Sequence, residues 1–204
     1  MSEPSSPNVQ LLATETRYEG FFKILALKVK HTLFGGGWSP VITRELFERG
    51  SAAAALLYDP HNDLLAMIEQ FRVGALMGGA KSPWCFEVVA GMIDEGETPE
   101  QSIRRELLEE ANFEPSDLPL ICSYLSSPGG SSERIHLYCA LGDLTNAGGI
   151  FGLAGESEDI KVHVLPAEQV LSQLYSDEYC NAATLIALQW LQANRERLRQ
   201  AALK

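Results

Sequence analysis

The segment Gly91–Phe113 constrains the fold of this chain more than any other stretch of its 204 residues. It joins a loop that begins with glycine to the start of a helix. Thr98 can cap that helix, Pro99 suits its first position, and Gln101 completes a Thr-x-x-Gln capping box. We therefore predict a helix over 99–111.

The predicted helix has an apolar face and an acidic face. Three apolar residues recur at helical spacing and should be buried: Ile103, Leu107 and Ala111. Three carboxylates converge on another face: Glu106, Glu109 and Glu110. Like charges at this spacing destabilise a helix by roughly 0.2–0.5 kcal/mol. The face is either simply solvated or binds a hard divalent cation such as Mg²⁺. A solvated face leaves the preceding loop unexplained, so we favour the cation.

The order and spacing of these residues resemble the Nudix box, written G-x5-E-x7-R-E-U-x-E-E-x-G-U with U a bulky apolar residue. The residues that match it in register are Gly91, Glu97, Arg105, Glu106, Leu107, Glu109 and Glu110. Asn112 stands where the pattern has its last glycine, and Phe113 fills the final apolar position. Asparagine tolerates the left-handed conformation that closes many helices, so this departure should disturb the helix end only mildly. It also removes no metal ligand. The resemblance implies the Nudix hydrolase family.

The similarity extends from about residue 16 to residue 190, to bacterial-type ADP-ribose pyrophosphatases. The segments that carry it are Tyr18–Phe22, Arg44–Gly50, Ile68–Arg72, Glu87–Met92, Ser127–Arg134 and Gly155–Ile160. A proline about fifteen residues beyond the box is associated with ADP-ribose preference, and Pro128 lies fifteen residues after Phe113.

The resemblance implies Mg²⁺-dependent hydrolysis of the diphosphate bond of ADP-ribose, to AMP and ribose 5-phosphate, with Mn²⁺ as an alternative ion. A broader nucleoside-diphosphate-sugar hydrolase is the first alternative, and hydrolysis of an oxidised dGTP is another. A third is a non-catalytic Nudix-fold protein that binds a nucleotide. Such proteins typically lose carboxylates of the box, whereas this chain keeps all three helix glutamates, which favours an enzyme.

The resemblance also implies a role for each candidate site residue. The metal ligands would be the carbonyl of Ala90 and the carboxylates of Glu106, Glu109, Glu110 and Glu158. Glu156 would be the general base, unless its acidic loop is merely solvated. The substrate contacts would be Phe21, Arg44, Arg72, Met92 and Glu133. Phe21 could equally pack in a core. The structural residues of the box would be Gly91, Glu97 and Arg105, with the last two paired to lock the loop to the helix.

Composition and strand patterns indicate the domain organisation. With 46% hydrophobic and 21% charged residues, the chain is typical of globular proteins. Residues 1–50 carry strand signals over 9–34 and 38–48 but have a small core, so this β-rich unit should pack on the larger domain or on a second subunit. The resemblance implies that the unit is exchanged between subunits, so we expect it to mediate homodimerisation. Residues 51–204 would form the Nudix hydrolase domain. The expected fold class is α/β, a Nudix-type α/β/α sandwich with this small N-terminal unit.

Local patterns predict the remaining elements of the larger domain. A hairpin is expected from strands 52–58 and 64–72, and 73–83 should be irregular. Further strands are predicted over 84–92, 118–125, 134–141 and 161–165. Helices are predicted over 168–175 and 181–201, and 155–159, which follows a glycine-rich stretch and precedes a strand, reads as a mobile loop.

Charge and cysteine usage limit the partners. A net charge of −11 argues against nucleic acid or an anionic membrane as partner. The start lacks a signal-peptide pattern and no 18-residue apolar stretch occurs, so we expect a cytoplasmic protein that does not span a membrane. The four cysteines form no C-x-x-C pair, which favours free thiols over a zinc site: Cys85, Cys122, Cys139 and Cys180.

Overall fold

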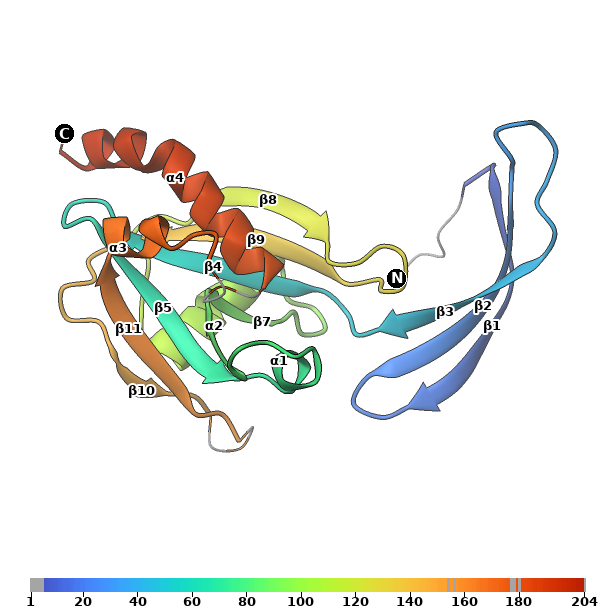
Figure 1. Cartoon of the computed structure of the whole chain (residues 1–204), viewed down its shortest axis with the longest axis horizontal. Helices are drawn as coiled ribbons and strands as arrows, with labels where there is room; N and C mark the ends of the chain where they lie inside the picture. Colours follow the sequence, from blue (N-terminus) through green and yellow to red (C-terminus); the bar gives the residue numbers. More distant parts are fainter. Residues whose placement is uncertain (1–5, 154, 156, 177–178, 180, 204) are drawn as a thin grey trace. The chain divides into compact units, whose positions relative to one another are not determined.

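The structure is a computed structural model that describes residues 6–153, 155, 157–176, 179 and 181–203. The described chain divides into two compact units (Figure 1). The first comprises the residues up to Ser51 together with Leu125–Arg134. The second comprises Ala52–Tyr124 and the chain from Ile135 onward. Residues 125–134, expected in the larger domain, therefore pack within the smaller unit.

The described part of the first unit contains a three-stranded antiparallel sheet. Its strands are β1 (Val9–Glu19), β2 (Lys23–His31) and β3 (Ile42–Glu48), in the order β1-β2-β3. Every residue of β1 is exposed, and Ala26 alone is buried within these three fully described strands. The sheet therefore has almost no core of its own.

A second segment of the chain returns to this sheet. The backbone N–H of Phe47 donates to the carbonyl of Gly130 at 2.8 Å. The hydroxyl of Ser132 donates to Glu48 Oε2 at 2.7 Å. Arg49 and Glu133 form an ion pair with a distance of 3.1 Å between Nε and Oε1. The segment 125–134 is thus attached to β3 and to the residues that follow it.

An eight-stranded sheet forms the centre of the second unit, as far as the structure describes it. The main path runs β10-β11-β5-β4-β9-β8, while β6 pairs with β5 and β7 pairs with β4. The strands are β4 (Ala52–Asp59), β5 (Leu64–Phe71), β6 (Trp84–Glu87), β7 (Val89–Met92), β8 (Leu120–Leu125), β9 (Arg134–Leu141), β10 (Gly149–Phe151) and β11 (Ile160–Pro166). The pairing of β4 with β9 is parallel.

The central strand β4 shows why the sheet is covered on both faces. All eight of its residues are buried, and successive side chains of a strand point to opposite faces. Leu56 and Tyr58 pack with residues of α3 (Ala167–Ser172) and α4 (Ala182–Ala202). The small side chains of Ala53 and Ala55 pack with α2 (Pro99–Ala111) on the other face. These layers form the predicted α/β/α sandwich (Figure 1).

The helix α2 begins and ends where the sequence predicts. Thr98 Oγ1 accepts from the backbone N–H of Gln101 at 3.2 Å, and the side-chain Oε1 of Gln101 accepts from the backbone N–H of Thr98 at 2.9 Å. Asn112 closes the helix in the left-handed conformation, with φ of 46°. The predicted capping box and left-handed closing residue are confirmed.

Three local predictions differ from the structure. The stretch 73–83 contains a short helix, α1 (Val73–Met77), closed by backbone bonds such as that from Gly78 N to Gly74 O at 2.8 Å. The strand expected over 84–92 is split at Val88, because β6 and β7 pair with different neighbours. The sequence pattern predicts no strand over 149–151, where β10 pairs with β11. Across the described residues, no helix combines the length and apolarity that membrane crossing requires.

Candidate active site

The helix α2 carries its three glutamates into progressively different environments. Glu110 is 2% exposed, and its carboxylate contacts Ala90 in β7. The side chain of Glu106 is 12% exposed and that of Glu109 is 28% exposed. The acidic face is therefore not simply solvated, and its two inner carboxylates lie in surroundings that disfavour charge.

Glu110 is the most strongly perturbed of these groups. Burial raises the pKa of its carboxyl to about 8, and the negative charges of Glu106 and Glu158 act in the same direction. A hydrogen bond of 3.2 Å from the backbone N–H of Ala90 and the positive charge of Arg72 oppose this rise. Negative charge is thus in excess around Glu110.

Glu106 lies beside the first glycine of the box. Burial is the main cause that raises the pKa of Glu106, the contact with Arg105 lowers it, and the charges of Glu109 and Glu158 raise it. A Cβ atom on Gly91 would overlap the carboxylate of Glu106. The glycine therefore allows β7 and the carboxylate to approach each other.

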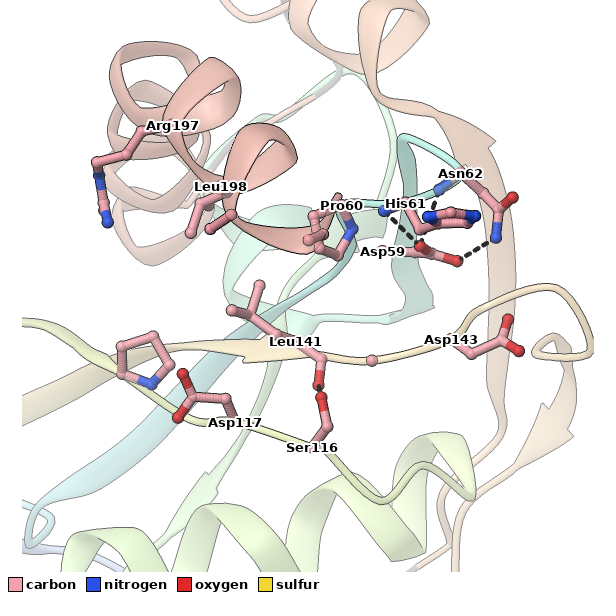
Figure 2. A pocket seen from close by; sticks show the side chains of 14 residues that line it. Asp59, Pro60, His61, Asn62, Ser116, Asp117, Leu141, Asp143, Arg197 and Leu198 are labelled. Atoms are coloured by element: carbon pink, nitrogen blue, oxygen red, sulfur yellow. Dashed lines mark hydrogen bonds between the residues drawn. The ribbon is translucent and has the colours of Figure 1, made fainter. Parts of the chain in front are cut away.

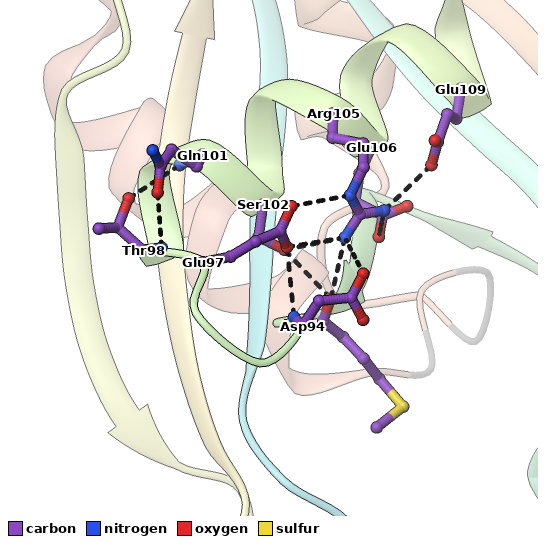
Figure 3. A network of polar contacts seen from close by, with 9 residues as sticks. Asp94, Glu97, Thr98, Gln101, Ser102, Arg105, Glu106 and Glu109 are labelled. Atoms are coloured by element: carbon purple, nitrogen blue, oxygen red, sulfur yellow. Dashed lines mark hydrogen bonds and ion pairs between the residues drawn. The ribbon is translucent and has the colours of Figure 1, made fainter.

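Arg105 connects the loop to the helix (Figure 3). Its Nε and Nη2 donate to the two carboxylate oxygens of Glu97 at 3.1 and 3.0 Å. Its Nη1 donates to Glu106 at 2.7 Å and to Glu109 at 3.1 Å, and Nη2 reaches the carbonyl of Met92 at 3.3 Å. One guanidinium thus holds the loop and neutralises part of the acidic face.

The donor set fits a hard divalent cation. As the side chains stand, no group of three His, Cys, Asp or Glu residues in the described part of the chain is arranged around a metal position, and Arg105 engages Glu106 and Glu109. The ligands available are nevertheless carboxylate oxygens, which Mg²⁺ prefers. The pKa values of Glu106 and Glu110 are raised mainly by burial and further by neighbouring carboxylates, and a bound cation would favour the charged forms.

The acidic loop brings a fourth carboxylate towards the same place. Glu158 adds to the negative charge felt by Glu106 and by Glu110. Its Oε2 accepts from the backbone N–H of Leu153 at 3.2 Å. Gly152 has φ of 107° and packs against the backbone of Glu158, where a side chain would not fit. Glu156, the expected general base, lies outside the described residues.

Arg72 lies near these carboxylates. It follows β5 directly, its side chain is 42% exposed, and its charge acts on Glu110. Its Nε donates to Glu87 Oε2 at 2.6 Å. Glu87 was not a candidate from the sequence; the available signal was a carboxylate at the buried end of an apolar strand.

Three of the expected substrate contacts belong to the first unit. Phe21 lies in the turn between β1 and β2, is 86% exposed and meets the edge of Phe22 at a centroid distance of 4.7 Å. The alternative of a core position for Phe21 is therefore excluded. Arg44 donates to the carbonyl of its neighbour Thr43 at 3.0 Å. Glu133 is buried and paired with Arg49, as described above.

A separate cavity of about 640 Å³ contains none of these residues (Figure 2). It is lined by the turn after β4, the loop before β8 and the end of α4. The carboxylate of Asp59 on its wall accepts from the backbone N–H groups of His61, Asn62 and Leu144 at 2.9 to 3.1 Å. This buried carboxylate is therefore already satisfied by the protein.

Comparison with known proteins gives consistent matches. A family model described as "NUDIX domain" matches residues 48–185. The chain is 43% identical over 199 residues to an ADP-ribose pyrophosphatase of Haemophilus influenzae, covering 97% of this chain and 92% of that protein. It is 44% identical over 192 residues to an ADP-ribose pyrophosphatase of Escherichia coli strain K12, covering 94% and 91%.

More distant matches agree with these. A GDP-mannose pyrophosphatase of Escherichia coli (strain SMS-3-5 / SECEC) is 35% identical over 154 residues, covering 74% of this chain and 78% of that protein. A solved structure titled "Crystal structure of ADP compounds hydrolase" superposes with a TM-score of 0.68 at 19% identity. It covers 97% of this chain and 100% of that one, and it supports the fold alone.

Proposed function

This chain belongs to the NUDIX domain family, and on that premise we propose that it hydrolyses the diphosphate bond of ADP-ribose to AMP and ribose 5-phosphate. The observation that carries the chemistry is the pair of buried carboxylates, Glu106 beside Gly91 and Glu110 beside Ala90, whose pKa values are raised by burial and by neighbouring carboxylates. The choice of substrate is supported by the ADP-ribose pyrophosphatases that match nearly the whole chain.

Nudix hydrolases generally use a divalent metal, and we propose Mg²⁺, with Mn²⁺ able to replace it. The residues proposed to hold it are the carbonyl of Ala90 and the carboxylates of Glu106, Glu109, Glu110 and Glu158. When bound, the ion would neutralise the diphosphate oxygens and stabilise the charge that develops at phosphorus. The oxygen ligands and the crowded negative charge around Glu110 support this assignment.

The chain's own residues supply binding, orientation and proton transfer. Arg72 can contact the diphosphate, because a guanidinium matches phosphate oxygens in a bidentate manner. Met92, Phe21, Arg44 and Glu133 are the other proposed substrate contacts. Glu156 is the proposed general base that takes a proton from the attacking water. A P–O bond forms to this water oxygen as one P–O bond of the P–O–P bridge breaks. The departing phosphate keeps the bridging oxygen and the electron pair of the broken bond.

The box provides the rigid frame for these groups. Arg105 joins Glu97 to the carboxylates of Glu106 and Glu109. We propose that Arg105 releases the last two when the cation binds, while its bond to Glu97 keeps the loop in place. Gly91 and Glu97 then act as structural residues.

The second candidate is a broader hydrolase of nucleoside diphosphate sugars. It is favoured by the match to a GDP-mannose pyrophosphatase over 74% of the chain. An oxidised nucleotide such as oxidised dGTP has no such support here. A non-catalytic nucleotide-binding role is disfavoured, because the chain keeps Glu106, Glu109 and Glu110.

We also propose that the protein is a homodimer, since β1 is exposed along its whole length. The reducing cytoplasm is the proposed location.

The function is tested with a panel of ADP-ribose, GDP-mannose, ADP-glucose and oxidised dGTP in the presence of Mg²⁺. Products are identified by chromatography, and released monophosphate is counted with a coupled phosphatase. We expect the highest kcat/KM for ADP-ribose, with AMP and ribose 5-phosphate in equal amounts and no turnover by Glu110→Gln. A higher kcat/KM for GDP-mannose would favour the second candidate, and turnover of none of them would reject both.

A further inference from the structure

Glu87 is a buried carboxylate between the candidate phosphate-binding arginine and the start of a long helix. It is the last residue of β6 and is 6% exposed. One oxygen accepts from Arg72 Nε at 2.6 Å, and the other accepts from the side-chain amide of Asn181. A buried carboxylate with both oxygens engaged holds its partners in fixed positions, because leaving either oxygen bare is unfavourable.

The amide of Asn181 is itself fixed by the helix that it caps. Its Oδ1 accepts from the backbone N–H of Thr184 at 2.8 Å, so the amide nitrogen must face Glu87. The hydroxyl of Thr184 then accepts from the backbone N–H of Val88 at 3.1 Å. The start of α4 is thereby attached twice to the junction of β6 and β7.

The arrangement leaves the outer part of the Arg72 guanidinium available. Its backbone N–H donates to the carbonyl of Pro83 at 2.7 Å, which fixes the base of the side chain. Glu87 engages Nε, and no bond from the two terminal nitrogens to another described residue is present. These nitrogens carry the pair of donors that matches a phosphate group.

We infer that Glu87, held by Asn181, is a positioning residue that orients Arg72 towards the substrate diphosphate. This inference rests on the proposed function, because it assigns a support to one of its substrate contacts. Glu87 touches neither the substrate nor the metal and acts through Arg72 alone. Asn181 acts one step further away, through Glu87.

The test is a double-mutant cycle in kcat/KM for ADP-ribose with saturating Mg²⁺. Glu87→Gln places an amide against one of two donors, so it should lower kcat/KM about 10- to 100-fold, as the loss of a partner that orients a metal ligand does. In an Arg72→Ala background the same change should have almost no further effect. Independent effects that multiply would overturn the inference, because Glu87 would then act by another route.

Asn181→Ser provides a second, milder variant. Serine caps a helix about as well as asparagine does, so α4 is retained while the donor to Glu87 is lost. We expect a smaller fall in kcat/KM, mainly through KM, and again none in the Arg72→Ala background. An unchanged kcat/KM in both Asn181→Ser and Glu87→Gln would overturn the inference.

The controls separate this inference from the proposed function. Glu69→Gln removes a carboxylate of β5 that pairs with His163 at 2.8 Å, so it tests for a general effect of breaking a polar contact in this sheet; kcat/KM should stay unchanged. Thermal unfolding midpoints identify variants that lose the fold. If wild type hydrolyses ADP-ribose but Arg72→Ala is fully active, the positioning role fails while the proposed function stands. Absence of hydrolysis by wild type would instead reject the proposed function.

Discussion

Gly91 lies against Glu106 so closely that a Cβ atom at position 91 would overlap the carboxylate. The contact joins strand β7 to helix α2 at the inner end of the acidic face. Because the overlapping atoms are at the end of a flexible side chain, an added methyl group should displace the carboxylate rather than the backbone.

Gly91→Ala should therefore reduce activity more than stability. We expect kcat/KM to fall about 10²-fold, the effect of a misplacement of about 1 Å at a reacting centre, with little change in the thermal midpoint. Gly35→Ala is the matched control, because a Cβ there meets nothing within 4 Å. A fully active Gly91→Ala variant would show that Glu106 has no fixed position in the active enzyme.

Glu110→Gln should abolish activity and, in the absence of metal, should make the protein more stable. Burial and, next, the charges of Glu106 and Glu158 disfavour the carboxylate, so its replacement should raise the thermal midpoint in EDTA. Mg²⁺ should stabilise wild type, by about 2.7 kcal/mol at a hundred times its Kd, and should not stabilise the variant. Glu100→Gln, at an exposed position of the same helix, should respond to Mg²⁺ as wild type does. Equal Mg²⁺ shifts in wild type and Glu110→Gln would remove Glu110 from the ligand set.

Glu156→Gln and Glu158→Gln should differ in their response to metal. Loss of a general base lowers kcat by about 10²–10⁴-fold, with little change in the Mg²⁺ requirement. Loss of a ligand should raise the Mg²⁺ concentration needed for half-maximal rate, since Glu158 contributes charge at Glu106 and Glu110. Asp159→Asn, an exposed neighbour, serves as the control. Small and equal effects at 156 and 158 would identify a merely solvated loop, and the base would then be sought at Glu109.

The N-terminal unit should mediate a homodimer. Along β1 all side chains are exposed, including Leu11 and Leu12 at 41% and 50%, so a further surface is needed to bury them. Light scattering coupled to size exclusion should give twice the chain mass at micromolar concentration. Leu12→Lys should weaken the dimer, whereas Lys28→Ala, a change at an exposed polar position on β2, is the control and should leave it intact. A fully active wild-type monomer would contradict the assignment.

Asp63 should link stability to pH. It accepts from Tyr58 Oη and from Arg195 Nε, both at 2.8 Å, and the contact with Arg195 is the main cause that lowers its pKa in the folded state. Its stabilisation is therefore present above the unfolded pKa of about 3.9 and lost as pH falls through the folded value. Asp63→Asn should lose about 1–3 kcal/mol at pH 7. The difference in free energy of unfolding between Asp63→Asn and wild type should become smaller in acid. Glu196→Gln should have nearly the same free energy of unfolding as wild type at any pH. A gap independent of pH would argue against an ionic contribution.

The parts of the fold that follow from short-range signals are those that the sequence predicts well. The cap at Thr98, the closing residue Asn112 and the buried stripe that includes Ile103 depend on neighbours within a few positions. The box spacing likewise brings Glu106 and Glu110 to one face without knowledge of the sheet.

Long-range contacts account for what the sequence does not predict. The break at Val88 arises because β6 pairs with β5 whereas β7 pairs with β4. The hydrogen bond between Asn181 and Glu87 joins residues 94 positions apart, so no local sequence pattern predicts it. Phe21 was ambiguous from the sequence because a single aromatic residue in an extended stretch reads alike whether it is buried or lies in an exposed turn.

The return of residues 125–134 to the first unit limits how this protein can be dissected. Truncation at Ala52 would remove Arg49 from Glu133 and Glu48 from Ser132. The excised catalytic fragment would then carry the ten-residue segment 125–134 without its partners, and the carboxylate of Glu133, buried in the intact chain, would lose its ion pair. A gene fragment encoding the box and its sheet is therefore not a self-sufficient module, and grafting it onto another protein would require redesign of this tip.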